Sequence, residues 1–165
     1  MFTKLLNPKT DTYRALKDIV LSDSFQWFYT ENKDKFGFYS HVFLERPGIK
    51  LYPRVMSEHS DLFECVLREI FEVNNIKAQC IYRMNANAVH SQKNILTNVF
   101  HHDHEFDHKN ILLYLTSAGG DTLTPASAYR PVEDDVVTFS GLHCHQTPVE
   151  GRRIVLVATY LDGNS

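Results

Sequence analysis

A cluster of metal-binding residue types lies past the middle of the chain, in the stretch VFHHDHEFDHKNILLYLT at residues 99–116. Four of the nine histidines of the chain lie within it, together with two aspartates. Imidazole nitrogens and carboxylate oxygens are ligands that many transition metals take in proteins. The apolar run ILLYL that follows is typical of a strand. The stretch therefore predicts a metal site at the start of a strand.

His101 and Asp103 are the first pair of candidate ligands. Residues i and i+2 of an extended chain point to the same face, so a nitrogen and an oxygen ligand would project together. A carboxylate aimed into a protein interior is costly unless a cation or a hydrogen-bond donor meets it. The same spacing recurs in His59-Ser60-Asp61, but there the serine and the aspartate fit a helix N-cap and a first-turn acid. We therefore interpret only the first pair as a metal-binding motif.

A third ligand is expected from a second histidine-rich segment, TFSGLHCHQTPVEG. His143 and His145 share one face of it, opposite Leu142 and Cys144. Two histidines and one carboxylate form the facial triad of non-haem iron(II) oxygenases, which leaves coordination positions open for other ligands. The residues alone leave both histidines open as the third ligand.

An arginine begins the last apolar segment, RIVLVATY. Arg153 alternates with Val155 and Val157, so it stands at the end of an inward, apolar row. A guanidinium can hold a carboxylate through two parallel hydrogen bonds. Beside a metal triad, we interpret Arg153 as a group that binds a ligand carboxylate, and we expect Arg152 to be exposed on the opposite face.

Helices and short strands must position these residues. Apolar residues recur with helical spacing over residues 11–21, where Thr10 or Asp11 caps the start, and over residues 61–73, where Ser60 is the expected N-cap. Segments rich in β-branched and aromatic residues, separated by turn residues, predict strands. The predicted strands are residues 35–44, 78–84, 110–116, 135–139, 143–147 and 153–161.

This pattern predicts a mainly β fold, a barrel or sandwich of mostly antiparallel strands with flanking helices. A length of 165 residues with 43% hydrophobic residues fits a single domain with one sizeable core. We divide that domain into helical and strand support over residues 1–77 and the barrel core over residues 78–163.

Composition argues against several classes of protein. The formal net charge is −3 with no basic block, so nucleic acid is an unlikely partner, because duplex binding needs a clustered positive face. The three cysteines show no CxxC spacing, which indicates neither a disulfide framework nor a zinc ribbon. No signal-like or membrane-spanning apolar run is found. The sequence therefore predicts a cytoplasmic protein that is not secreted and has no membrane partner.

The motifs together resemble the 2-oxoglutarate- and iron(II)-dependent oxygenases, and within them the small prolyl-4-hydroxylase-like proteins of phages and marine bacteria. The resemblance runs through FQWFYTE, IYRMNAN, FHHDHEFDHKNILLYLTSAGGDT and DDVVTFSGLHCHQTPVEGRRIVLVATYLD. The family pattern is His-x-Asp, a strand ending in Tyr-Leu-Asn, Gly-Gly-x-Thr, a distal histidine and a basic residue on the last strand. This chain departs from it at Thr116, where asparagine is usual.

The resemblance implies a double-stranded β-helix, the jelly-roll barrel also found in cupins, with His101 and Asp103 on the metal. The distal ligand depends on which family spacing applies. His145 lies six residues after Phe139, the usual distance, and is slightly favoured. His143 lies ten residues before Arg153, also a common spacing, and is the alternative.

The implied activity is hydroxylation of an unactivated C–H bond with Fe(II), 2-oxoglutarate and O2, releasing succinate and CO2. Arg153 and Tyr114 would hold the distal carboxylate of 2-oxoglutarate, and Tyr82 and Asn85 would line the cofactor pocket. Ascorbate is a further requirement to test. The substrate would be a peptidyl, prolyl-like group or a small molecule.

Two other functions stay open. His102, His104, Asp107 and His108 approximate the zinc motif of metallo-β-lactamase-like hydrolases, with one residue too many. A cupin-type barrel could bind a metal without 2-oxoglutarate, and it would have no need of Arg153. Replacing Arg153 by alanine would separate these functions from the oxygenase.

Overall fold

The computed structural model describes residues 1–31, 36–48 and 53–163. Within these ranges the helices are α1 (Asp11–Leu21) and α2 (Ser60–Val73). The larger sheet contains β1 (Thr3–Leu5), β2 (Phe28–Thr30), β3 (Phe38–Glu45), β4 (Arg54–Val55), β5 (Ala78–His90), β6 (Lys109–Tyr114), β9 (Val136–Ser140) and β11 (Arg152–Asp162). The smaller sheet contains β7 (Thr122–Thr124), β8 (Ser127–Tyr129) and β10 (Cys144–His145).

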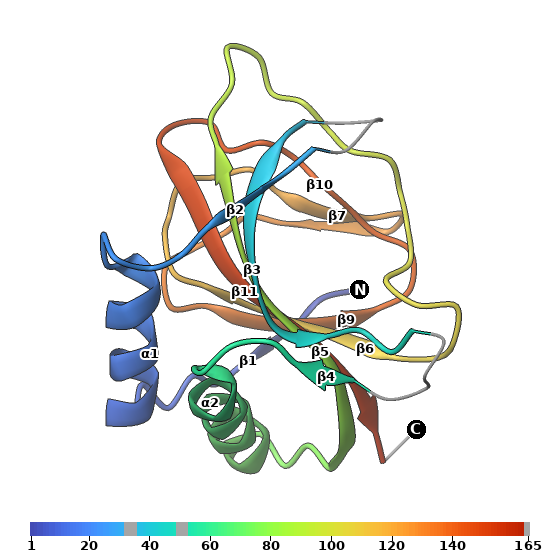
Figure 1. Ribbon diagram of the computed structural model, residues 1–165. Helices are drawn as coiled ribbons and strands as arrows, with labels where there is room; N and C mark the ends of the chain where they lie inside the picture. Colours follow the sequence, from blue (N-terminus) through green and yellow to red (C-terminus); the bar gives the residue numbers. More distant parts are fainter. Residues whose placement is uncertain (32–35, 49–52, 164–165) are drawn as a thin grey trace.

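Every strand pairing in these sheets is antiparallel. The larger sheet has the order β1-β9-β6-β11-β5-β3-β2, with β4 paired to β3, and the smaller has the order β10-β7-β8. Figure 1 shows the chain curving into a barrel with α1 and α2 on its outside. The expectation of a mainly β, jelly-roll type of fold with flanking helices is confirmed.

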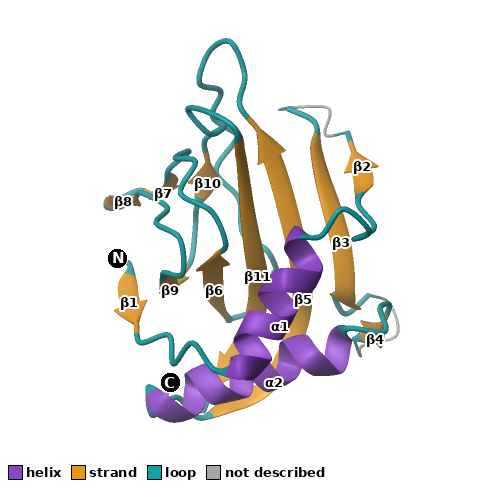
Figure 2. Ribbon diagram, turned by 90° about the vertical axis from the view of Figure 1, so that its left-hand side faces the viewer, coloured by secondary structure: helices purple, strands orange, loops and turns teal. Residues whose placement is uncertain are grey.

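The long central strands β5, β6 and β11 are covered on both faces. One face of these strands packs under the helices, which lie across this sheet in Figure 2. It carries even-numbered residues of β5 and β11 and odd-numbered residues of β6. This core contains Met84, Ala86, Ala88, Ile111, Leu113, Ile154, Leu156 and Ala158. The alternate side chains face the interior of the barrel, so the two-residue period of a strand decides which residues can reach a ligand there.

The helices agree with the predicted ones apart from one cap. The hydroxyl of Thr10 accepts a hydrogen bond from the backbone N–H of Tyr13 at 3.1 Å, as expected of an N-cap. Ser60 is not the N-cap of α2 but its first residue, because its hydroxyl donates to the carbonyl oxygens of Phe43 and Ser57. In the described part of the chain, neither helix is long and apolar enough to cross a membrane.

Several strand boundaries differ from the predicted ones. β5 continues to His90, six residues beyond the predicted end, and β10 has only two residues. The expected strand at 35–44 begins at Phe38 in the structure, and residue 35 lies outside the described residues. The short strands β1, β2, β4, β7 and β8 were not predicted, because two or three residues are too few to show a period.

Candidate metal centre

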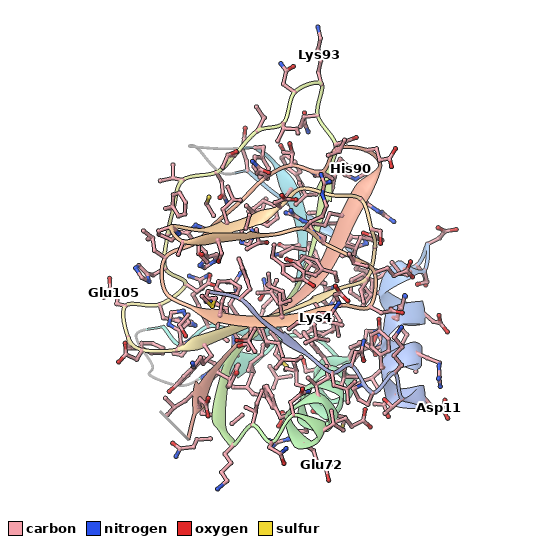
Figure 3. The ribbon with its side chains drawn as sticks, turned by 180° about the vertical axis from the view of Figure 1, so that it is seen from behind. Lys4, Asp11, Glu72, His90, Lys93 and Glu105 are labelled. Carbon is pink, nitrogen blue, oxygen red and sulfur yellow. The ribbon has the colours of Figure 1, made fainter. Side chains whose placement is uncertain are left out.

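Two segments far apart in sequence are paired through their backbones at the candidate metal centre. The N–H of His101 donates to the carbonyl of His143 at 2.8 Å, and the N–H of His143 donates to the carbonyl of His101 at 3.1 Å. This bridge sets the two imidazole rings beside each other, with centroids 4.5 Å apart. His101 belongs to the long connection between β5 and β6, along which Figure 3 labels Lys93 and Glu105, away from Glu72 of α2.

Asp103 joins this pair as the spacing predicted. Its side chain is 8% exposed, and Oδ2 lies 3.7 Å from Nε2 of His143. That distance is too long for a hydrogen bond between the two groups. It is close to the separation of about 3 Å expected for neighbouring ligands at metal bonds of about 2.1 Å. A small movement would therefore let both atoms bind one ion.

His145 completes a cluster of imidazoles. The ligand nitrogens of His101, His143 and His145 lie within 4.8 Å of one another. Nδ1 of His145 is hydrogen-bonded to the hydroxyl of Thr122 at 3.0 Å. Because His143 and His145 are two residues apart on β10 and its approach, both point to the barrel interior, as the sequence indicated.

The charges at the cluster suit a divalent metal ion. Burial is the largest single influence on the pKa of Asp103 and raises it, but Arg83, the two neighbouring imidazoles and Arg46 together outweigh burial, and the pKa is lowered to about 2. Burial lowers the pKa of His143, and burial together with Arg153 lowers that of His145. An ionised carboxylate and neutral imidazoles are the forms that bind metals. This donor set fits Fe(II), and His101, Asp103 and one of the two other histidines could hold it.

A cavity of about 310 Å³ contains the cluster and also Arg153. The Arg153 side chain is buried, with the residue only 3% exposed, and one of its terminal nitrogens donates to the carbonyls of Gln146, at 2.8 Å, and Gly120. Its Nε is buried and has no partner among the described residues. Val155 and Val157 line the same cavity, whereas Arg152 is exposed. The predicted alternation of the last strand is therefore confirmed.

Gly120 lets the chain pass close to the segment that Arg153 binds. Its φ is +80°, and a Cβ built there would lie 2.8 Å from the carbonyl oxygen of Gln146. A larger residue would both strain the backbone and displace the carbonyls that hold Arg153. Gly120 of the sequence motif thus supports the position of the arginine.

Tyr114 lies behind the cluster and not on the cavity wall. Its hydroxyl is hydrogen-bonded to the hydroxyl of Thr122 at 3.0 Å, and Thr122 in turn contacts His145. The side chain is fully buried, and burial raises its pKa to about 12. The structure therefore connects Tyr114 to the site through Thr122.

The structure does not bring Tyr82 to the cavity. The pairing of β5 with β11 shifts register between Arg83 and Ile81, and the Tyr82 ring packs instead against His104 and Phe106. Asn85 is 6% exposed, and its Oδ1 accepts a hydrogen bond from Nε of Arg83 at 3.2 Å. Asn85 therefore contacts the site through an arginine.

Two buried amides lie in the cavity wall, and one of them, Asn110, was not found as a site residue from the sequence motifs. Oδ1 of Asn87 and both polar side-chain atoms of Asn110 are buried without a partner among the described residues. Asn110 is the second residue of β6, directly before the run at residues 111–114, and it lines the cavity together with Leu112. The two-residue spacing of Asn110 and Leu112 is the signal that could have identified it.

The histidines of the hydrolase alternative form no common metal-binding group among the described residues, although the rings of His104 and His108 are in contact, with centroids 4.8 Å apart. Nε2 of His104 is hydrogen-bonded to the hydroxyl of Thr159 at 2.7 Å, and Nδ1 of His108 to the carbonyl of Phe106 at 2.7 Å. His102 is exposed at the edge of the cavity. Over residues 1–31, 36–48 and 53–163, these three form no group that could share a metal ion.

Comparison by sequence finds no matching protein family and no matching curated protein. Solved structures do match. An oxidoreductase of the 2OG-Fe(II) oxygenase family from Burkholderia pseudomallei has a TM-score of 0.69 at 15% identity, covering 96% of this chain and 84% of the other.

Two prolyl hydroxylases match over similar lengths. The viral collagen prolyl hydroxylase of Paramecium bursaria Chlorella virus-1 gives a TM-score of 0.59 at 13% identity, covering 96% of this chain and 94% of the other. A prolyl hydroxylase from Trichoplax adhaerens, solved with a hypoxia inducible factor peptide, gives 0.62 at 11% identity, covering 99% and 84%. The chain therefore has the fold of the 2OG-Fe(II) oxygenases.

Proposed function

We propose that this protein is an Fe(II)- and 2-oxoglutarate-dependent oxygenase. The observation that carries the proposal is that the cluster of His101, Asp103 and His143 and the buried Arg153 line one cavity. A keto acid with a second carboxylate needs a metal for one end and a cation for the other. The reaction would convert 2-oxoglutarate, O2 and a C–H bond into succinate, CO2 and an alcohol.

For the metal ligands we propose His101, Asp103 and His143, with His145 as the alternative third ligand. Three contacts support this choice over the slight preference of the sequence for His145. His143 pairs with His101 through the backbone, their rings adjoin, and His143 faces Oδ2 of Asp103. In both residues Nδ1 is hydrogen-bonded, in His143 to the carbonyl of Gly141 and in His145 to the hydroxyl of Thr122, so Nε2 of either residue is left for a metal and His145 stays the alternative.

Arg153 would bind the distal carboxylate of 2-oxoglutarate. Its guanidinium is already fixed by the carbonyls of Gly120 and Gln146, so little side-chain freedom is lost on binding. Tyr114 would act through Thr122, whose hydroxyl it contacts. Bound iron would supply the activation of dioxygen, which these side chains cannot perform themselves.

For the substrate we propose a peptidyl, prolyl-like side chain, with a small molecule as the alternative. Support comes from the viral collagen prolyl hydroxylase and from the Trichoplax enzyme solved with a peptide, which share the fold. Fold alone supports many substrates, so this step rests on analogy. A cytoplasmic location remains our expectation from the composition.

A spectroscopic titration tests the proposal without knowledge of the substrate. Fe(II) is added to the metal-free protein without oxygen, followed by 2-oxoglutarate, and the visible spectrum is recorded. Chelation of a keto acid by Fe(II) gives a charge-transfer band, which we expect for the wild type. The band should need at least about 10-fold more 2-oxoglutarate in Arg153→Ala, because a charged hydrogen-bonded pair is lost.

Arg152→Ala is the matched control, since Arg152 is the exposed neighbour on the opposite face of β11. Its charge-transfer band should appear at the same 2-oxoglutarate concentration as that of the wild type. A band that is equally strong in Arg153→Ala would favour a cupin-type site. Absence of any band, with tight Zn(II) binding, would favour a hydrolase, for which three imidazoles are also a suitable donor set.

A further inference from the structure

Arg83 is the charged group closest to the Asp103 carboxylate. It lies on β5, with 13% of its side chain exposed, and its Nη1 donates to Oδ1 of Asp103 at 2.7 Å. Its Nε donates to Oδ1 of Asn85 at 3.2 Å. Two attachments, one at each end of the planar group, fix the orientation of the guanidinium.

The two oxygens of Asp103 therefore have different surroundings. Oδ1 accepts the hydrogen bond of Arg83, whereas Oδ2 lies on the side of His143, 3.7 Å from its Nε2. A carboxylate that binds a metal through one oxygen occupies one coordination position, and one that binds through both occupies two. Holding Oδ1 away from the metal would keep an additional position open for other ligands.

We propose that Arg83 is a positioning residue that turns Asp103 so that only Oδ2 is presented to the metal. The inference rests on the proposed function of the site, because it concerns the same metal ion. Neither the metal-binding motif nor the structural comparisons assign a role to Arg83.

Arg46 offers a natural comparison at the same carboxylate. Its guanidinium donates to the backbone carbonyl of Asp103 at 3.1 Å, but its nearest approach to Oδ1 is 3.9 Å, and half of its side chain is exposed. Arg46 thus places a positive charge nearby without the direct bond to the carboxylate. Substituting each arginine separates the effect of charge from that of orientation.

The loss of charge and the loss of orientation should change the metal affinity in opposite directions. Removal of a positive charge beside a metal site favours binding of a dication, because repulsion is lost. Loss of orientation weakens binding, and removing a group that holds a metal ligand typically costs about 10- to 100-fold in affinity. A weaker metal complex in an Arg83 variant would therefore report positioning and not charge.

The experiment is a titration of the metal-free protein with Co(II), followed by visible absorption, which reports affinity and coordination number together. We expect the Kd of Arg83→Gln to rise about 10- to 100-fold, with an altered Co(II) spectrum. Arg83→Lys should recover part of the affinity, because an ammonium can still donate to Oδ1. Arg46→Gln should stay within about 2-fold of the wild type or bind slightly tighter.

The outcomes separate this inference from the proposed function. Wild-type affinity and spectrum in a folded Arg83→Gln protein would overturn the role of Arg83 while leaving the metal site intact. Failure of the wild type to bind Co(II) would overturn both. Circular dichroism checks folding, and if Arg83→Gln does not fold, Arg83→Met decides, because its side chain is of similar length and cannot donate to Oδ1: weaker Co(II) binding with a changed spectrum supports positioning, and the wild-type spectrum and Kd overturn it.

Discussion

Asp134 and Asp103 are two carboxylates of similar acidity in different regions of the molecule. Asp134 lies just before β9, where α1 packs, and accepts hydrogen bonds from Tyr13 and, at 2.7 Å, from Lys17. Its second oxygen lies 3.0 Å from Nζ of Lys9. Burial raises its pKa, but these donors outweigh that effect and lower the pKa to about 2, the same value as for Asp103.

The difference lies in how the two groups reach that value. Both oxygens of Asp134 are met by cationic groups, so this carboxylate attaches α1 to the barrel and has nothing left to bind. Asp103 is met on Oδ1 by Arg83, and its Oδ2 faces the imidazole of His143, which is not at hydrogen-bonding distance. A low pKa alone therefore does not mark a functional carboxylate, whereas an incompletely partnered one beside a cavity does.

The largest effect should come from removing the imidazole that faces Asp103. We expect His143→Ala to weaken Fe(II) or Co(II) binding by more than about 100-fold, since losing a ligand should exceed the cost of losing a group that holds one. His145→Ala should cost less than about 10-fold. Metal titration of the two single variants measures both values.

His145 provides the control because it is the neighbouring imidazole of the same cluster. The reverse order of the two variants would make His145 the third ligand and would restore the preference drawn from the sequence. Equal large losses would indicate a three-histidine site and would weaken the contrast with Asp134.

Asp134→Asn should act on stability and not on the metal. We expect the free energy of unfolding to fall by about 1–3 kcal/mol, because Lys17 and Tyr13 lose a charged acceptor. Metal affinity should remain that of the wild type. Urea denaturation and a Co(II) titration on the same samples test both statements, and a weakened metal site would show that the two regions are coupled.

The same carboxylate predicts how stability changes with pH. Its pKa is about 2 in the folded protein and about 3.9 in an unfolded chain, so its contribution is present above pH 4 and is lost as the pH falls toward 2. This pKa difference corresponds to at most about 2.6 kcal/mol, and screening by solvent near the surface reduces the contribution to about 1–2 kcal/mol. The stability difference between wild type and Asp134→Asn should therefore shrink over this range, and a constant difference would contradict the assignment.

Local signals predicted much of this architecture. The capping residue and apolar spacing of α1 and the alternation around Arg153 depend on neighbours in sequence, and both are found in the structure. β5 was predicted too short because Asn85 and Asn87 interrupt its apolar pattern. Asn87 is tolerated there because it lines the cavity, and Asn85 because it accepts a hydrogen bond from Arg83.

The third metal ligand could not be decided from spacing. His143 and His145 share a face, so alternation treats them alike. What distinguishes them is the backbone pairing of His143 with His101, a contact between distant segments that no local pattern encodes. Tyr82 was placed in the cofactor pocket for a related reason, since the register shift that turns it away is set by the partner strand.

The smallest effect concerns Asn110, whose side-chain amide lines the same cavity as Asp103. Because both of its polar atoms are buried without a partner in the described structure, Asn110→Leu should leave stability unchanged or raise it by about 1 kcal/mol. Thr138→Val is the matched control. The Thr138 hydroxyl donates to the backbone carbonyl of Asn110 at 2.8 Å, so its removal should cost about 1 kcal/mol.

Thermal denaturation of the metal-free variants shows whether each substitution raises or lowers stability. The charge-transfer band gives the affinity for 2-oxoglutarate. If the free amide serves a ligand, Asn110→Leu should weaken that binding several-fold, by about 1 kcal/mol, while Thr138→Val should not. Destabilisation by Asn110→Leu would mean that the amide supports the fold, as Asp134 does. A stable variant with weaker 2-oxoglutarate binding would assign Asn110, like Asp103, to ligand binding. The polar group would then be kept for a ligand at the expense of stability.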